Sequence, residues 1–293
     1  GRVVGMDNGT ITNILSEMGS TGADYSETLA EASRLGYAEA DPTADVEGYD
    51  AAAKAAILAS IAFHSRVTAG DVYREGISRI SPDDFESARD MDCTIKLLAI
   101  CEKLTDADGR EAVSARVYPA LLPNSHPLAA VNGAFNAVVV EAEAAGRLMF
   151  YGQGAGGSPT ASAVLGDVVA AARNKVGAGR APGESTYAAL PVASMEDIST
   201  RYHVRMRVSD KPGVLAQVAA EFAHHGVSIA QVRQTEVEPP ETEAEDVEPS
   251  AEITVLTHLA SERALAATVA ALSDQDPVAD ITSVIRLEGV DTE

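Results

Sequence analysis

The chain has 293 residues, of which 46% are hydrophobic and 23% charged, a composition that suits a globular protein with a sizeable core. Its formal net charge of −22 argues against nucleic acid or an anionic membrane as a main partner. No run of about 18 apolar residues is present, so we expect no membrane span and a cytoplasmic protein. Cys93 and Cys101 have neither disulfide-framework nor metal-binding spacing, and we expect two reduced thiols and no metal. The chain starts at Gly1 without a methionine, from which we expect a cut or incomplete N-terminus.

Strand and helix signals alternate from the N-terminus to about residue 175. We expect strands within 1–9 and over 93–104, 111–122, 134–141 and 147–151. We expect helices over 10–19, 24–35, 48–64 and 160–173, and another that opens at Ser81-Pro82-Asp83-Asp84. The turn signal Asp106-Ala107-Asp108-Gly109 makes 93–104 and 111–122 an antiparallel hairpin.

The texture changes after a Gly- and Pro-rich boundary at Gly177–Ser185. Strands are expected over 201–209, 227–237, 251–258 and 279–287, helices over 213–225 and 261–273, and an acidic loop over 239–250. This β-α-β-β-α-β order is the ferredoxin-like arrangement. We therefore predict an α+β protein with a larger mixed-sheet domain over 1–194 and a small ferredoxin-like domain over 195–293.

The stretch from Gly36 to Leu58 is the most informative about function, because a cluster of carboxylates runs into an Ala-rich helix that carries Lys54. On a 3.6-residue period Asp50, Lys54, Ile57, Leu58 and Ile61 share a face, which we expect to point to the interior. Burial favours a neutral amine and nearby carboxylates favour the ammonium, a balance that suits proton transfer. The alternative is an ordinary i,i+4 ion pair on a wet helix face.

Two more groups of residues are candidates for ligand binding near this stretch. Glu39, Asp41, Asp45 and Glu47 could together hold an ammonium group or a divalent ion, although the EF-hand spacing is missing and a solvated acidic loop is the simpler interpretation. Asn8-Gly9-Thr10 precedes a helix, where backbone N–H groups and the Thr10 hydroxyl could bind a carboxylate. An ordinary N-cap is the alternative there.

Glycine-containing turns provide two further candidate sites. Gly152 to Thr160 follows a strand and precedes a helix, a setting that favours anions such as phosphates. Its literal G-x-G-x-x-G match lacks the βαβ context of a dinucleotide fingerprint, so a structural turn is the alternative. Asp210-Lys211-Pro212-Gly213-Val214-Leu215 lies between the first strand and helix of the small domain, where a backbone turn could receive an amino acid's carboxylate or merely link the two elements.

Taken together, these motifs resemble the homoserine dehydrogenase family without its N-terminal nucleotide-binding domain. The segment Gly36-Tyr37-Ala38-Glu39-Ala40-Asp41-Pro42 through Lys54 is similar to the family signature G-[YF]-x-E-x-D-P … D-x-x-G-x-D-x-x-x-K. Asp210 to Leu215 is similar to the D-x-P-G-V-L turn of ACT domains. The implied reaction is reversible hydride transfer between L-aspartate 4-semialdehyde and L-homoserine, in threonine and methionine biosynthesis.

The resemblance also implies roles for individual residues. Lys54 would be the catalytic proton donor and acceptor. Substrate would be bound by Glu39, Asp50, Gly9 and Thr10, and the cofactor, NADP or NAD, by Gly36, Gly154, Ala155 and Gly156, although mainly by the absent domain. Asp210, Gly213, Val214 and Leu215 would bind an amino-acid effector such as threonine, and a homo-oligomer is implied.

Asp7 departs from the family pattern, which usually has an apolar residue there, and the family's aromatic residue near Asn13 is also absent. Without the nucleotide-binding domain we expect this polypeptide alone to have little or no dehydrogenase activity. The rival hypothesis is a non-enzymatic, threonine-sensing ACT module with the rest as scaffold. Glu39, Asp50 and Lys54 favour the enzyme, because a pure sensor does not need them.

Overall fold

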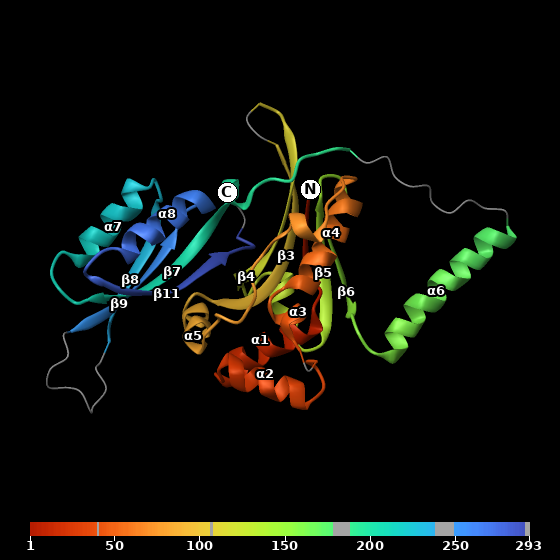
Figure 1. The fold of residues 1–293 in the computed structure, drawn as a ribbon, viewed down its shortest axis with the longest axis horizontal. Coiled ribbons are helices and arrows are strands. Elements are labelled where there is room, and N and C mark those ends of the chain that lie inside the picture. Colours follow the sequence, from red (N-terminus) through yellow and green to blue (C-terminus); the bar gives the residue numbers. More distant parts are fainter. Residues whose placement is uncertain (40, 106–107, 178–187, 238–248, 291–293) are drawn as a thin grey trace. The chain divides into compact units, whose positions relative to one another are not determined.

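The computed structural model describes residues 1–39, 41–105, 108–177, 188–237 and 249–290 (Figure 1). The chain forms two compact units, and each is described by itself. The first comprises Gly1–Pro119 and Asn124–Ala193, and the second comprises Ala120–Pro123 and Ser194–Glu293. The fold is α+β, with a large mixed sheet and a C-terminal ferredoxin-like arrangement, as the sequence predicts.

The sheet of the first unit has the strand order β6-β5-β1-β3-β4. These strands are β1 (Arg2–Met6), β3 (Cys93–Thr105), β4 (Glu111–Pro123), β5 (Phe135–Ala142) and β6 (Gly146–Gln153), and the short β2 (Tyr73–Arg74) pairs with β4 in parallel. β1 is antiparallel to both its neighbours, β3 and β5. Because it is central and its last four residues are buried, β1 fixes where the following Asp7 and Asn8 lie.

The helices of the first unit begin at capping residues that the sequence supplies. They are α1 (Gly9–Thr21), α2 (Tyr25–Arg34), α3 (Thr43–Val46), α4 (Tyr49–Phe63), α5 (Pro82–Asp90) and α6 (Gly157–Val176), with 3₁₀ turns at Ala69–Asp71 and Pro127–Ala130. Asn8, Asp24 and Ser81 accept hydrogen bonds from the first turns of α1, α2 and α5. α3 differs from the sequence prediction, because its four residues lie within the stretch of Glu39, Asp41, Asp45 and Glu47, for which an acidic loop is the simpler interpretation.

The helix over Tyr49–Phe63 forms as predicted, but the expected buried face is wrong. Ile57 and Ile61 are 58% and 68% exposed. The buried side chains are instead alanines, which follow the helical spacing 51, 52, 55, 56 and 59. α4 packs through this alanine face on β3, where the Cys101 thiol donates to the Ala55 carbonyl at 3.3 Å. Small side chains allow that close approach, and the isoleucines are left on the opposite side.

The second unit has the sheet order β11-β7-β9-β8, all antiparallel, with the β-α-β-β-α-β chain order that the sequence predicts. Its elements are β7 (Ser199–Ser209), α7 (Val214–His224), β8 (Ile229–Val237), β9 (Ser250–Thr257), α8 (Glu262–Ser273) and β11 (Val278–Leu287), with a 3₁₀ turn at Met195–Asp197 and a short β10 (Ala260–Ser261). Its core includes Phe222 and Leu272, both fully buried. This separate core positions the turn between β7 and α7.

Two predicted segments fall largely outside the described residues: the boundary at Gly177–Ser185 and the acidic loop over 239–250. Within the described part of the chain, no helix has the length and apolar character needed to cross a bilayer.

Candidate active site

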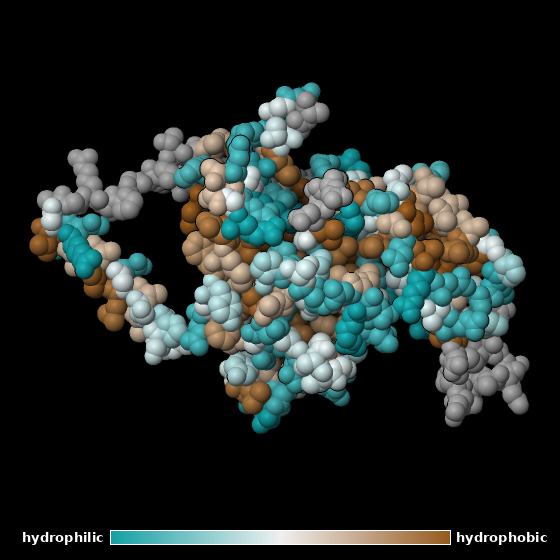
Figure 2. Space-filling model, turned by 180° about the vertical axis from the view of Figure 1, so that it is seen from behind, coloured by the Kyte–Doolittle hydropathy of each residue, from teal (hydrophilic) through white to brown (hydrophobic). Residues whose placement is uncertain are grey.

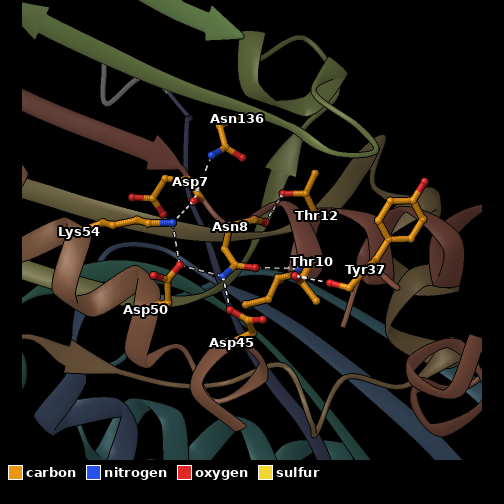
Figure 3. Close-up of polar contacts among 10 residues, drawn as sticks. Asp7, Asn8, Thr10, Thr12, Tyr37, Asp45, Asp50, Lys54 and Asn136 are labelled. Atoms are coloured by element: carbon orange, nitrogen blue, oxygen red, sulfur yellow. Dashed lines mark hydrogen bonds and ion pairs between the residues drawn. The ribbon is translucent and has the colours of Figure 1, made fainter. Parts of the chain in front are cut away.

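Lys54 reaches from α4 to the end of β1, so its ammonium joins two elements (Figure 3). Lys54 Nζ lies 2.7 Å from Asp50 Oδ2 and donates a hydrogen bond of 2.5 Å to the Asp7 carbonyl oxygen. The side chain is 40% exposed, so it is reachable by solvent rather than buried as the predicted face implied. The i,i+4 pair with Asp50 exists, but the tertiary contact with Asp7 gives the ammonium a fixed place that a surface pair lacks.

Asn8 organises the carboxylates around this lysine. Its Nδ2 donates to Asp45 Oδ1 at 2.7 Å and to Asp50 Oδ2 at 2.9 Å, while its Oδ1 accepts from the Ile11 N–H at 2.9 Å. Asn8 is 7% exposed, and both ends of its amide are used, so the orientation of the amide is determined by its partners. The Asn8 side chain therefore caps α1 and also binds the Asp45 and Asp50 carboxylates.

The Asp7 carboxyl group is the unusual member of the cluster. Burial, more than any other influence, raises its pKa from 3.8 to about 6; the Lys54 charge opposes this rise and the Asp50 charge adds to it. Around Lys54 there are thus Asp50 and Asp45, held by the Asn8 amide, and a third carboxyl that takes up a proton near neutral pH. This arrangement can hold a cationic group and can move a proton.

The loop after α2 lies at the start of α1, as the motif spacing requires. The Thr10 hydroxyl donates to the Tyr37 carbonyl at 2.9 Å, which ties the Asn8-Gly9-Thr10 turn to the Gly36 segment. Gly36 has φ of +80°, a left-handed conformation that favours glycine, and it is exposed. Glu39 is exposed as well.

The glycine-rich loop Gly152–Gly157 approaches the same region through Asn136 on β5. A Cβ built on Gly154 would lie 1.8 Å from Asn136 Nδ2, so a side chain at this position would have to displace that amide. Asn136 in turn donates to the Asp7 carbonyl at 3.1 Å. Further along, Gly156 and Gly157 line an open hollow of about 790 Å³ together with the first half of α6.

In the second unit, the predicted effector residues share one cavity. Asp210, Gly213, Val214 and Leu215 all line a pocket of about 330 Å³. Gly213 has φ of +95° and caps α7, and Gln234 donates to Asp210 Oδ1 at 3.1 Å. The turn links β7 to α7 and also forms part of the wall of this pocket.

The structure brings together Lys54, Asp50 and the start of α1, but it adds residues that the motif roles did not include. The sequence makes Asp45 one of four acidic residues that could hold an ammonium group or a divalent ion, and Asn8 part of a turn that could bind a carboxylate or cap a helix, but it does not link the two residues. Asn136 carries no local signal at all, because it meets Asp7 across 129 positions of sequence. Among the described residues, no group of three or more His, Cys, Asp or Glu side chains is placed to hold a metal ion.

The family model described as homoserine dehydrogenase matches residues 1–169, and the ACT domain model matches residues 202–276. Homoserine dehydrogenases of Mycobacterium bovis and Corynebacterium glutamicum are 68% and 62% identical over 98% of this chain. The chain spans 64% and 62% of the length of these two relatives. The crystal structure of a homoserine dehydrogenase from Thiobacillus denitrificans is similar with a TM-score of 0.88 and 38% identity, over 98% of this chain and 64% of the other.

Proposed function

Because the chain belongs to the homoserine dehydrogenase family, we propose that it supplies the acid–base and substrate-binding part of the reversible, NADP-dependent conversion of L-aspartate 4-semialdehyde to L-homoserine. The observation that carries this proposal is the placement of Lys54 between the Asp50 carboxylate and the Asp7 carbonyl. Threonine and methionine biosynthesis is the setting we assign to this step.

The geometry suggests how these residues act. Lys54, as the ammonium, gives a proton to the aldehyde oxygen as negative charge develops there, and in the reverse direction the neutral amine takes the hydroxyl proton. Asp50 and Asp45, gathered by Asn8, present carboxylate oxygens that suit the amino end of the substrate. We assign Glu39, Gly9 and Thr10 to the same substrate site.

The nicotinamide cofactor supplies the hydride when it is bound. Gly154, Ala155 and Gly156 fit a cofactor, because backbone groups of an exposed glycine loop before a helix are open to an anion. Gly36 is assigned to the same cofactor site. We place the main part of the cofactor site in the portion of the relatives that this chain does not span, and we therefore expect the chain alone to have little activity. NADPH-dependent turnover by the 293-residue chain at a native-like rate would contradict that expectation.

Replacing Lys54 tests the enzymatic role in a longer protein that includes the cofactor-binding portion of the relatives. Lys54→Met should lower kcat by about 10²- to 10⁴-fold, the usual contribution of general acid–base catalysis. Lys103→Met, which removes a lysine paired with Glu111 elsewhere on the sheet, is the control and should keep turnover. Unchanged turnover in Lys54→Met removes this residue from the mechanism. Absence of turnover in the unaltered longer protein would instead favour the rival, a threonine-sensing module without enzymatic activity.

We also propose that the pocket beside Asp210 and Gly213 binds an amino-acid effector such as threonine. Titration calorimetry of the 293-residue chain with threonine should show binding, and Asp210→Ala should weaken it. Absence of binding by the unaltered chain would argue against this effector.

A homo-oligomer is proposed from two apolar features of the first unit, the strand β6 and the helix α6. Every residue of β6 is exposed, α6 has no buried residue, and β6 is the terminal strand of the sheet order. The exposed large apolar residues are Leu148, Met149, Phe150 and Tyr151 on β6 and Val164, Leu165, Val168 and Val169 on α6. Figure 2 shows apolar residues along the exposed helix α6. Most of the stability of a protein helix comes from packing of one face, which the 20-residue α6 lacks, and an exposed edge strand is a template for pairing with another chain.

We propose that a second copy of the chain covers the apolar residues of β6 and α6. Sedimentation equilibrium should show a dimer or larger species that Phe150→Glu disrupts. Leu35→Glu, at an exposed leucine at the end of α2, is the matched control and should leave the mass unchanged. A monomeric unaltered chain would exclude the proposal.

A further inference from the structure

The Asn136 side chain, on β5, lies between the Lys54 cluster and the glycine-rich loop. Its Nδ2 donates a hydrogen bond of 3.1 Å to the Asp7 carbonyl oxygen, the same atom that accepts the 2.5 Å bond from Lys54 Nζ (Figure 3). One backbone carbonyl therefore receives the lysine and the amide together. Asp7 directly precedes Asn8, so the peptide that both groups contact also leads into the carboxylate cluster.

The other side of the Asn136 amide contacts the loop at Gly154. A Cβ at Gly154 would lie 1.8 Å from Nδ2 and 2.4 Å from the side-chain carbonyl carbon of Asn136. Real Cβ atoms do not approach that closely, so a side chain there must push the amide away. Asn136 also pairs with Gly152 in the β5–β6 ladder. That pair holds the backbone of Asn136, so the contact at Gly154 is the one that links the loop to the side-chain amide.

The donor end of the amide determines its orientation. Asn136 Oδ1 is buried and has no hydrogen-bond partner among the described residues, whereas Nδ2 has the Asp7 carbonyl. Turning the amide over would place two oxygens against each other and would lose this bond. The buried Oδ1 is left without a hydrogen bond, which costs free energy, while Nδ2 keeps its hydrogen bond to the Asp7 carbonyl.

We propose that Asn136 is a positioning residue that couples the glycine-rich loop to Lys54 through the Asp7 carbonyl. The inference rests on the proposed role of Lys54 in proton transfer. Without the amide, water can take the second lone pair of the carbonyl and the Asp7–Asn8 peptide loses a contact that fixes its tilt. Lys54 Nζ then leaves the carbonyl more often. A ligand that shifts the loop acts on Lys54 by the same route.

The reactivity of Lys54 in the 293-residue chain tests this coupling without any turnover. Reductive methylation is followed by peptide mass spectrometry, with the exposed Lys175 as the internal reference. Asn136→Ala should raise the Lys54 rate about two- to tenfold, the range for the loss of one hydrogen bond. Gly154→Ala should raise it similarly, and the double variant should be no faster than Asn136→Ala, because one shared route is already cut.

Gly152→Ala is the matched control in the same loop, since a Cβ there meets nothing within 4 Å and should leave the Lys54 rate unchanged. Unaltered Lys54 reactivity in Gly154→Ala, an equal rise in Gly152→Ala, or additive effects in the double variant would each overturn the coupling. Asn136→Ser replaces Asn136→Ala if circular dichroism shows that the alanine variant does not fold. Full turnover in the longer protein with Lys54→Met would contradict the proposed role of Lys54 in proton transfer. The labelling rates would still decide whether Asn136 couples the loop to Lys54.

Discussion

Replacing Asp7 by asparagine should make the chain more stable at neutral pH and leave its stability nearly unchanged in acid. The pKa of this carboxyl group rises from 3.8 to about 6 in the folded chain, chiefly because burial disfavours the charged form. Between these two values the folded state binds more protons than the unfolded state, so the stability of the unaltered chain falls as the pH rises. The shift corresponds to about 3 kcal/mol, which is lost in full above the folded pKa. Asparagine has the same shape and no such loss.

Urea unfolding of both proteins at a series of pH values between about 4 and about 8 measures this difference, because other titrating groups cancel in the comparison. The free-energy gap should be near zero at the acid end and approach its full size at the neutral end. Asp71→Asn is the opposite-sign control: hydrogen bonds from Thr68 lower the pKa of Asp71, so this change should weaken the chain at neutral pH. A gap for Asp7→Asn that does not vary with pH would refute the reasoning.

Two substitutions and one labelling experiment test other features of the first unit. Asn8→Ala removes a helix cap and two hydrogen bonds to carboxylates, and it should lower the unfolding free energy in urea by about 2–4 kcal/mol; Asp24→Ala, which removes only a cap and a local bond to Ser26, should cost less. Gly76→Ala places a Cβ 2.5 Å from the Val46 carbonyl, so thermal unfolding should show a marked loss, and an unchanged midpoint would contradict that packing. Burial raises the pKa of Cys101 to about 12, so iodoacetamide should label it only in denaturant.

The arrangement of elements could be predicted from the sequence because local signals agree with the fold. The caps at Asn8 and Ser81 mark helix starts, and the β-α-β-β-α-β order identifies the second unit before any contact is known. Periodicity could not decide which face of α4 is buried. Isoleucine is more apolar than alanine, so Ile57 and Ile61 seemed to mark the buried face, whereas the close approach to β3 selects the smallest side chains.

The candidate site was predictable only where its residues share one stretch of sequence. Asp50 and Lys54 are one helical turn apart, so their pairing follows from spacing. The contacts of Asp7 with Lys54 and Asn136 depend on where β1 ends in the sheet, which no local pattern reports. The raised pKa of Asp7 has the same origin, because burial is a property of the folded chain.

The alanine face of α4 fixes the position of the helix backbone that carries Lys54. Alanine has no side-chain rotamers, so a contact made through Ala51, Ala55 and Ala59 offers no alternative packings among which the helix could drift. The thiol of Cys101 against the Ala55 carbonyl adds a fixed point at mid-helix. Lys54 therefore varies in position through its own side chain alone, and the groups that hold its ammonium govern where, in the proposed mechanism, the proton would be delivered.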